Sequence, residues 1–130
     1  MSQTQAPEGL HYTDEHEWVD HQDGVCTVGI TDYAQAELGD IVFVEMPEVG
    51  NSLEKGESFG TVEAVKTVAD LYAPVSGEVV AINTALEDDA ASVNTDPYGD
   101  GWMIKIRLDD PQSLESLLSP QAYEALISEA

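Results

Sequence analysis

The chain has 130 residues, enough for one hydrophobic core of ordinary size. It carries 26 Asp and Glu against 4 Lys and Arg, so its formal net charge is −22. Binding to nucleic acid or to an anionic membrane through a basic surface is excluded, because both need clustered positive charge. With 42% hydrophobic residues, the chain is expected to fold rather than to remain a disordered acidic tail.

The N-terminal segment 1–9 is polar, and we expect it to be flexible ahead of a single domain that spans residues 10–130. Residues 1–54 contain no Lys or Arg, which argues against a signal peptide and a basic transit peptide. Cys26 is the only cysteine, so no disulfide can form within the chain. The longest apolar runs are far shorter than a membrane span. We therefore expect a cytoplasmic protein.

Short runs of β-branched residues between turn residues predict several brief strands. These runs cover residues 25–30, 41–46, 58–65, 67–75, 78–83 and 102–108. Thr31 and Asp32 offer an N-cap for a short helix near 32–38, and Gly39 is placed to end it. Residues 87–101 are expected to form a loop.

The C-terminal segment changes to a helical spacing of apolar residues. Asp110-Pro111 and Ser119-Pro120 each place a capping residue before a proline, so two C-terminal helices are expected. Many short strands with few helices predict a mainly β fold, a small sandwich or barrel with peripheral α elements.

Two features of the sequence are candidate ligand-binding motifs. Residues 60–67 nearly spell a phosphate-binding loop, but Val65 stands where the second glycine is needed, and no helix signal follows. His11, His16 and His21 recur every five residues, a spacing that suits neither one face of a helix nor one face of a strand. We expect three mostly exposed histidines. A small metal-dependent hydrolase that uses them with nearby carboxylates stays open as an alternative.

Lys66 is the lysine with an unusual setting, because it joins two strand-forming runs with no room for a long loop. A lysine at the tip of such a hairpin holds its amine out in solvent at a defined point. An enzyme that acylates a lysine with a cofactor needs this arrangement. An ordinary exposed turn lysine is the alternative interpretation.

Four ordered blocks then resemble the glycine cleavage system H protein family. They read GTVEAVKTVADLYAPVSGEVVAIN from 60, HYTDEHEWV from 11, GITDYAQAELGDIVFVEMPEVG from 29, and VNTDPYGDGWMIKI from 93. Together with C-terminal pieces they span about residues 10 to 127. Around the lysine, this chain has EAVKTVA where the family usually has ESVKAAS. The resemblance implies a lipoyl/biotinyl-type β-sandwich, also called a barrel-sandwich hybrid.

The resemblance implies a non-catalytic carrier with lipoic acid joined to Lys66 by an amide, as N6-lipoyl-lysine. The lipoyl group would accept the aminomethyl fragment from a pyridoxal-phosphate-dependent glycine decarboxylase and pass it to a tetrahydrofolate-dependent aminomethyltransferase. A flavin-containing dihydrolipoyl dehydrogenase would then reoxidise it. A lipoate ligase, or a lipoyl or octanoyl transferase, would attach the group.

The resemblance implies that the loaded arm folds into a cleft on the carrier. Glu17, Asp70 and Glu15 match positions associated with that cleft, where carboxylates would pair with the positive amine of the cargo. Two other functions are retained beside the hydrolase: a relay that donates lipoyl groups to other enzymes, and an interaction module without a cofactor.

Overall fold

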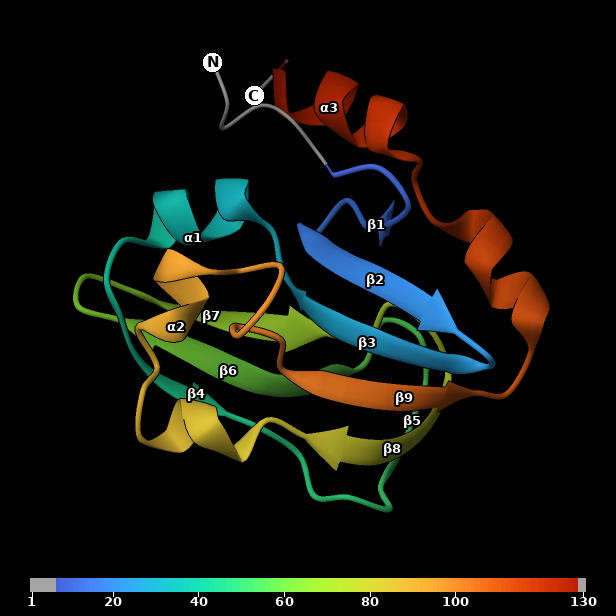
Figure 1. Ribbon diagram of the computed structural model, residues 1–130, viewed down its shortest axis with the longest axis horizontal. Helices are drawn as coiled ribbons and strands as arrows, with labels where there is room; N and C mark the ends of the chain where they lie inside the picture. Colours follow the sequence, from blue (N-terminus) through green and yellow to red (C-terminus); the bar gives the residue numbers. More distant parts are fainter. Residues whose placement is uncertain (1–6, 129–130) are drawn as a thin grey trace.

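Nine strands form two antiparallel sheets in the computed structural model, which describes residues 7–128 (Figure 1). The six-stranded sheet has the order β1 (His11–Tyr12), β2 (Glu17–Gln22), β3 (Val25–Ile30), β9 (Ile104–Leu108), β8 (Gly77–Ile82) and β5 (Ser52–Leu53). The three-stranded sheet has the order β4 (Ile41–Glu45), β6 (Ser58–Ala64) and β7 (Val68–Tyr72). The mainly β sandwich expected from the sequence is confirmed.

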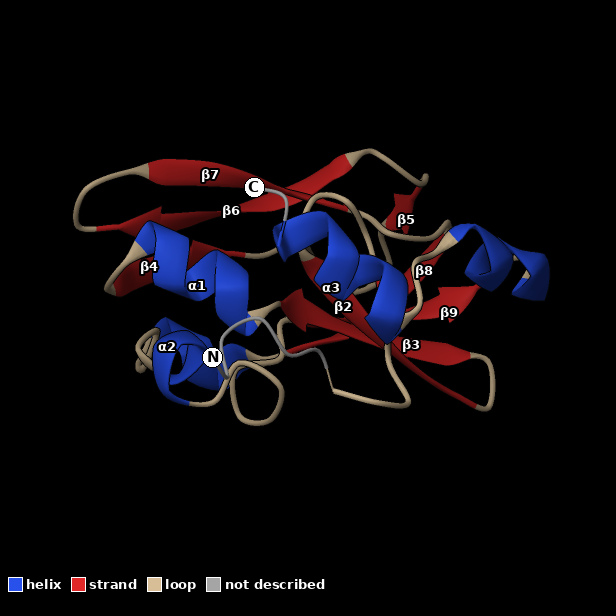
Figure 2. Cartoon of the chain, turned by 90° about the horizontal axis from the view of Figure 1, so that it is seen from above, coloured by secondary structure: helices blue, strands red, loops and turns tan. Residues whose placement is uncertain are grey.

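Short helices lie around the sheets. They are α1 (Asp32–Leu38), α2 (Ser92–Thr95) and α3 (Pro120–Ser128), with two 3-10 helices at Thr84–Glu87 and Pro111–Ser116. Figure 2 shows α1 and α2 at one end of the sandwich, and Figure 1 shows α3 above β1 and β2. No helix within residues 7–128 is long and apolar enough to cross a membrane.

The main core lies between the inner faces of the two sheets, since alternate residues of each strand point inward. From the three-stranded sheet, Val44, Val62 and Leu71 are at most 2% exposed. Val28, Val79, Ile104 and Ile106 of the opposite sheet are fully buried. Burial of these side chains is the main stabilising contribution to the sandwich.

A second, aromatic cluster fixes α3 to the outside of the large sheet. The Tyr12 and Tyr123 rings stack with centroids 4.8 Å apart, and Trp18 and Ile127 complete the cluster. Tyr12 also exchanges backbone hydrogen bonds with Leu118 just before α3 begins. The C-terminal segment is therefore docked by packing and pairing together.

Helix α1 begins and ends where the sequence predicts. The Thr31 Oγ1 accepts a hydrogen bond from the Ala34 amide at 3.2 Å, as an N-cap does. Gly39 ends the helix with φ 85° and ψ −155°, a conformation that is essentially restricted to glycine.

Three expectations need correction. The predicted loop 87–101 contains α2, because burying Val93 completely outweighs the turn-forming residues around it. The first C-terminal helix is a 3-10 helix capped by Asp110. The three histidines are half-buried rather than mostly exposed, since β1, β2 and the turn between them pack against neighbouring elements.

Candidate functional site

Lys66 lies in the tight turn between β6 and β7, as predicted, and is exposed. The Ala64 amide donates to the Thr67 carbonyl across the turn at 2.8 Å. This hairpin reaches past α1 at the left edge of Figures 1 and 2. Among the described residues, no hydrogen-bond or ion-pair partner of the Lys66 amine is found. The amine is accessible to another protein.

The segment that follows α1 supports the Lys66 turn. The Val65 amide donates to the Asp40 carbonyl at 3.0 Å. A Cβ placed on Gly39 would lie 3.3 Å from the Lys66 Cε, so the lysine stem rests against the glycine backbone. The turn and the end of α1 therefore form one continuous surface.

Asn94 of α2 anchors that segment with three hydrogen bonds. Its Oδ1 accepts from the Ile41 amide at 2.9 Å, and its Nδ2 donates to the Gly39 carbonyl at 2.8 Å and to the Gln35 Oε1 at 2.9 Å. Near the other end of α1, the Tyr98 hydroxyl accepts from the Asp32 amide at 3.0 Å. Residues of the block 93–106 thus hold both ends of α1.

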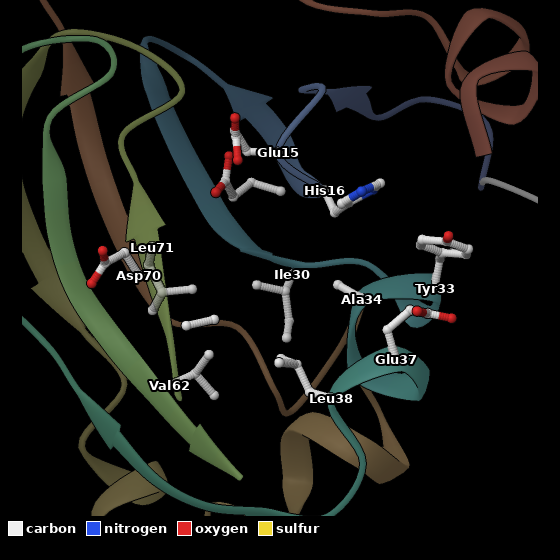
Figure 3. A pocket seen from close by; sticks show the side chains of 12 residues that line it. Glu15, His16, Ile30, Tyr33, Ala34, Glu37, Leu38, Val62, Asp70 and Leu71 are labelled. Carbon is white, nitrogen blue, oxygen red and sulfur yellow. The ribbon is translucent and has the colours of Figure 1, made fainter. Parts of the chain in front are cut away.

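A cleft of about 350 Å³ opens between α1 and β7 (Figure 3). This volume falls in the range of small-molecule sites, roughly 300–1,000 Å³. Ile30, Leu38 and Val62 point toward one another in its lower part in Figure 3. Glu15 lies in the upper part, and Glu37 and Asp70 lie on opposite sides, so acidic residues surround an apolar floor.

Glu17 is the buried acid of the cleft, only 2% exposed. Its Oε1 accepts from the Thr13 hydroxyl at 2.6 Å, and its Oε2 accepts from the Tyr72 amide at 3.2 Å. Burial raises the pKa of Glu17 to about 7, although these two hydrogen bonds favour the charged form. The carboxyl group therefore titrates near neutral pH and is held in a defined orientation.

Glu15 and Asp70 are more exposed members of the same cleft. Figure 3 shows Glu15 in the upper part of the cleft, whereas the Asp70 carboxylate points away from the middle toward the far side of β7. The Tyr72 hydroxyl reaches Asp70 at 3.5 Å. The cleft thus brings together Glu17, which is buried, and Glu15, which lies at its rim, whereas Asp70 lines the cleft without pointing its carboxylate into it.

Three further lining residues with polar side chains, His16, Tyr33 and Glu37, were not predicted from the sequence. His16 has φ 71°, and its Nδ1 lies 2.8 Å from the Tyr123 hydroxyl, which contacts the Thr31 Oγ1 at 2.7 Å. Burial lowers the pKa of His16. The helical spacing of Tyr33 and Glu37 was a usable signal, because α1 presents both on one side.

The structure offers no support for a histidine metal site. No group of three or more His, Cys, Asp or Glu side chains within residues 7–128 is arranged to hold a metal ion. His16 instead bonds to Tyr123, and His21 accepts from the Gly24 amide at 3.1 Å. Both rings thus have structural contacts.

Comparison with known proteins gives one consistent result. The family model described as glycine cleavage H-protein matches residues 10–130. The chain is 57% identical over 123 residues to a glycine cleavage system H protein of Chromohalobacter salexigens, with 94% of each chain covered. It is 60% identical to the corresponding protein of Chlorobaculum parvum, over 95% of this chain and 98% of that one.

A solved structure agrees with these sequences. The crystal structure of a glycine cleavage system H protein from Mycobacterium marinum superposes with a TM-score of 0.88 at 43% identity. The superposition covers 95% of this chain and 99% of that one. Proteins of this family carry covalent lipoyl-lysine and have no catalytic activity of their own, which excludes the hydrolase alternative. The chain belongs to the glycine cleavage H-protein family and is the lipoyl-bearing carrier of the glycine cleavage system.

Proposed function

We propose that Lys66 carries the lipoyl group and that the cleft beside α1 receives the loaded arm. One observation carries this proposal: the exposed Lys66 rests its stem against Gly39, the residue after Leu38, and Leu38 lines the cleft that contains the buried acid Glu17. Residues 10–130 would form the carrier as one unit. The protein would work in the cytoplasm.

The residues present fit a covalently attached lipoyl group. Lys66 has a free approach from solvent, and Gly39 leaves room for its stem. Attachment requires the neutral amine to attack the carbonyl carbon of an activated lipoyl donor. An amide bond then forms, the bond to the leaving group breaks, and the amine loses its proton. A lipoate ligase or a lipoyl or octanoyl transferase would catalyse this step.

When bound, the lipoyl group supplies a disulfide that accepts the aminomethyl fragment of glycine and is later left as a dithiol. This chain contributes positioning and electrostatics. The apolar part of the cleft, near Leu38 and Val62, would exclude water from the arm. Glu17 would face the cargo amine, and a cation beside it would favour its charged form. We therefore expect Glu17 to release a proton when the arm docks.

Glu15 and Asp70 would act at the rim of the cleft. Both are exposed, so their contribution to binding the amine is smaller than that of the buried Glu17. They would guide the positive cargo into the cleft and release it again without a large desolvation cost.

The partners would be three enzymes of the glycine cleavage system: the pyridoxal-phosphate-dependent decarboxylase, the tetrahydrofolate-dependent aminomethyltransferase and dihydrolipoyl dehydrogenase. A net charge of −22 allows long-range steering toward basic surfaces on these enzymes. Weak electrostatic contacts let one carrier leave each enzyme in turn. Raising the ionic strength should slow turnover through the association rate.

The attachment site is tested by incubating the unmodified protein with lipoate, ATP and a lipoate ligase. Intact mass should increase by one lipoyl group, and peptide mapping should locate it on Lys66. The modified protein should then support glycine decarboxylation. Support by the unmodified protein would contradict the carrier mechanism.

The cleft is tested by measuring how long the loaded arm survives in water. Glu17→Ala should shorten the lifetime by roughly tenfold, as expected for the loss of a buried charged contact. Asp70→Ala should have a smaller effect, and Glu115→Ala, an exposed acid that is not among the residues lining the cleft, should have none. Unchanged lifetimes in both cleft variants would remove the acids from this role.

A lipoyl relay is the second candidate, because the same attachment would serve donation to other enzymes. Complementation separates the two functions. A strain that lacks glycine cleavage should be rescued by the shuttle, and a strain that lacks lipoyl transfer should be rescued by the relay.

A further inference from the structure

An apolar surface flanks Lys66 on an otherwise acidic protein. Six large hydrophobic side chains are exposed within the part of the chain that the structure describes. Four of them lie on or beside the Lys66 hairpin: Val42 (56% exposed), Phe43 (46%), Val65 (75%) and Val68 (61%). We call these four residues the hairpin patch. Single exposed hydrophobic side chains are ordinary on a protein surface, whereas clusters of them mark interaction sites.

The strand register places two members of the patch, Phe43 and Val68, on one face of the three-stranded sheet. Phe43 pairs with Glu63, and Glu63 pairs with Val68, so these three side chains form a row across β4, β6 and β7. All three are exposed. Val65 begins the turn beside this row, where its amide is bonded to Asp40 on the neighbouring chain segment.

A β-bulge adds Phe43 to the patch. In regular alternation, the residue two after the buried Ile41 would also point inward. The register shifts between Ile41 and Phe43, so Val42 and Phe43 both face solvent and Val44 returns to the core. Bulges of this kind re-aim side chains. The fold thus exposes an aromatic residue next to Lys66 that a regular strand would bury.

We propose that the hairpin patch is the docking surface for the enzyme that acylates Lys66, and not for the enzymes that act on the finished arm. This inference rests on the proposed attachment at Lys66. The acylating enzyme must bring its reaction centre to the lysine Nζ, so it has to cover the turn and its neighbours. An enzyme that acts on the far end of the arm can do so without touching the hairpin.

Charge defines the chemistry of this partner surface. Glu63 lies between Phe43 and Val68 in the strand register. The exposed acids Asp40, Glu45 and Asp70 border the hairpin patch. A complementary surface has an apolar centre that accepts the patch and basic residues around it. The acylating enzyme that carries this surface uses a lipoyl group activated as an acyl adenylate or a thioester. AMP or a thiol leaves as the amide forms, and the proton of the attacking amine passes to a base.

The test uses the full unmodified chain, a purified lipoate ligase, lipoate and ATP. The patch variant is Val42→Thr, Phe43→Thr, Val65→Thr and Val68→Thr combined, which keeps the charge and, at the three valines, the β-branched shape. Its kcat/KM for acylation, followed by intact mass, should fall roughly 10- to 100-fold, mainly through KM. Val49→Thr is the matched control, because Val49 is 59% exposed outside the patch, and it should leave the rate unchanged.

The second measurement uses both proteins after complete acylation with excess ligase. Glycine decarboxylation with the patch variant should stay within about twofold of the unsubstituted protein, since its arm is intact. An unchanged acylation rate would overturn the proposal. An equal loss in both assays, or a patch-dependent dimer in sedimentation, would also overturn it, because the surface would then have another occupant.

Two controls keep the outcome interpretable. If the combined variant melts at a lower temperature than the unsubstituted protein, Val68→Thr alone, on the edge strand β7, replaces it. This single substitution should lower kcat/KM for acylation about threefold. Failure of the unsubstituted protein to gain a lipoyl group at Lys66 would contradict the proposed attachment site. That result is distinct from a rate that is unaffected by the patch.

Discussion

The two ends of strand β6 each carry a lysine in a turn, but their surroundings differ. Lys55 precedes the strand, its amine donates to the Ser116 hydroxyl, and its backbone amide donates to the Ser76 Oγ at 2.9 Å. Lys66 follows the strand beside exposed valines, with its stem against Gly39. Both lysines are exposed and lie in turns, so these two properties do not distinguish them, and we expect the different surroundings to decide which one is modified.

The cavities near the two lysines differ in the same way. Lys55 borders a hollow of about 270 Å³ that contains the exposed Asp14. On the Lys66 side, the cleft of about 350 Å³ contains the buried Glu17. A buried acid with a hydrogen-bonded orientation can discriminate a ligand amine, whereas an exposed acid is screened by water. The predictions below test this contrast, from the largest effect to the smallest.

Replacing each lysine in turn should show that lipoyl attachment depends on only one of the two lysines that flank β6. Lys66→Arg should abolish lipoyl attachment and glycine decarboxylation, because a guanidinium does not act as the acylated amine. Lys55→Arg should leave both intact. Intact mass after exhaustive reaction measures the outcome, and a lipoyl group on Lys55 in the Lys66→Arg protein would break the comparison.

Glu17 should make stability depend on pH. Its pKa is raised from 4.5 to about 7, so the folded state holds the proton more tightly than the unfolded state. This contribution is complete below the unfolded pKa and is lost as the pH rises through about 7, a change of up to about 3 kcal/mol.

Glu17→Gln should therefore raise the free energy of unfolding above about pH 7 and have little effect below about pH 4. Urea titrations across this range measure it. Asp14→Asn, on the Lys55 side, should change stability by less than about 0.5 kcal/mol at either pH. Equal pH profiles for the original protein and the Glu17→Gln variant would contradict the raised pKa.

Two asparagines give a matched test of the support beneath Lys66. Asn94 and Asn83 each make three side-chain hydrogen bonds, but Asn83 bonds to Asp100, Trp102 and Ala85, away from α1. Replacing either with Leu should cost about 2 kcal/mol of stability. Only Asn94→Leu should also shorten the lifetime of the loaded arm and slow acylation of Lys66. Similar losses of function in both variants would indicate a general effect of destabilisation.

The glycines beside the two lysines give the smallest expected effect. Gly39 and Gly56 both have positive φ, 85° and 89°, so an Ala at either site should cost about 1 kcal/mol. A Cβ at Gly56 meets open space, whereas a Cβ at Gly39 meets the Lys66 stem. Gly39→Ala alone should alter the initial rate of acylation, by about twofold to threefold. Equal rates would show that the stem moves freely.

Much of the secondary structure could be predicted from local pattern. The strand at Val25–Ile30 and the helix at Asp32–Leu38 have the predicted bounds, because β-branched runs and capping residues act locally. α2 was not predicted, since its stability depends on the buried Val93.

In the candidate site too, local pattern predicted some features and tertiary contacts decided the others. Glu17 was selected through the family resemblance, but its raised pKa comes from burial between distant segments, and its orientation comes from Thr13 and from the Tyr72 amide, 55 residues away. The bulge that exposes Phe43 had no signal in the run IVFVEM, which reads as an ordinary buried strand. Register is set by pairing with β6, and pairing is not a local property.

The net charge, the β-rich pattern and the position of Lys66 between two strand-forming runs were determined by the sequence alone. These are sums over residues or preferences of neighbouring residues, so they need no knowledge of distant contacts. Only the tertiary structure decided which lysine amine lacks a bonding partner among the described residues, which acid is buried and which apolar side chains face solvent. Each of these properties depends on segments that are distant in the chain and meet only when the two sheets pack together.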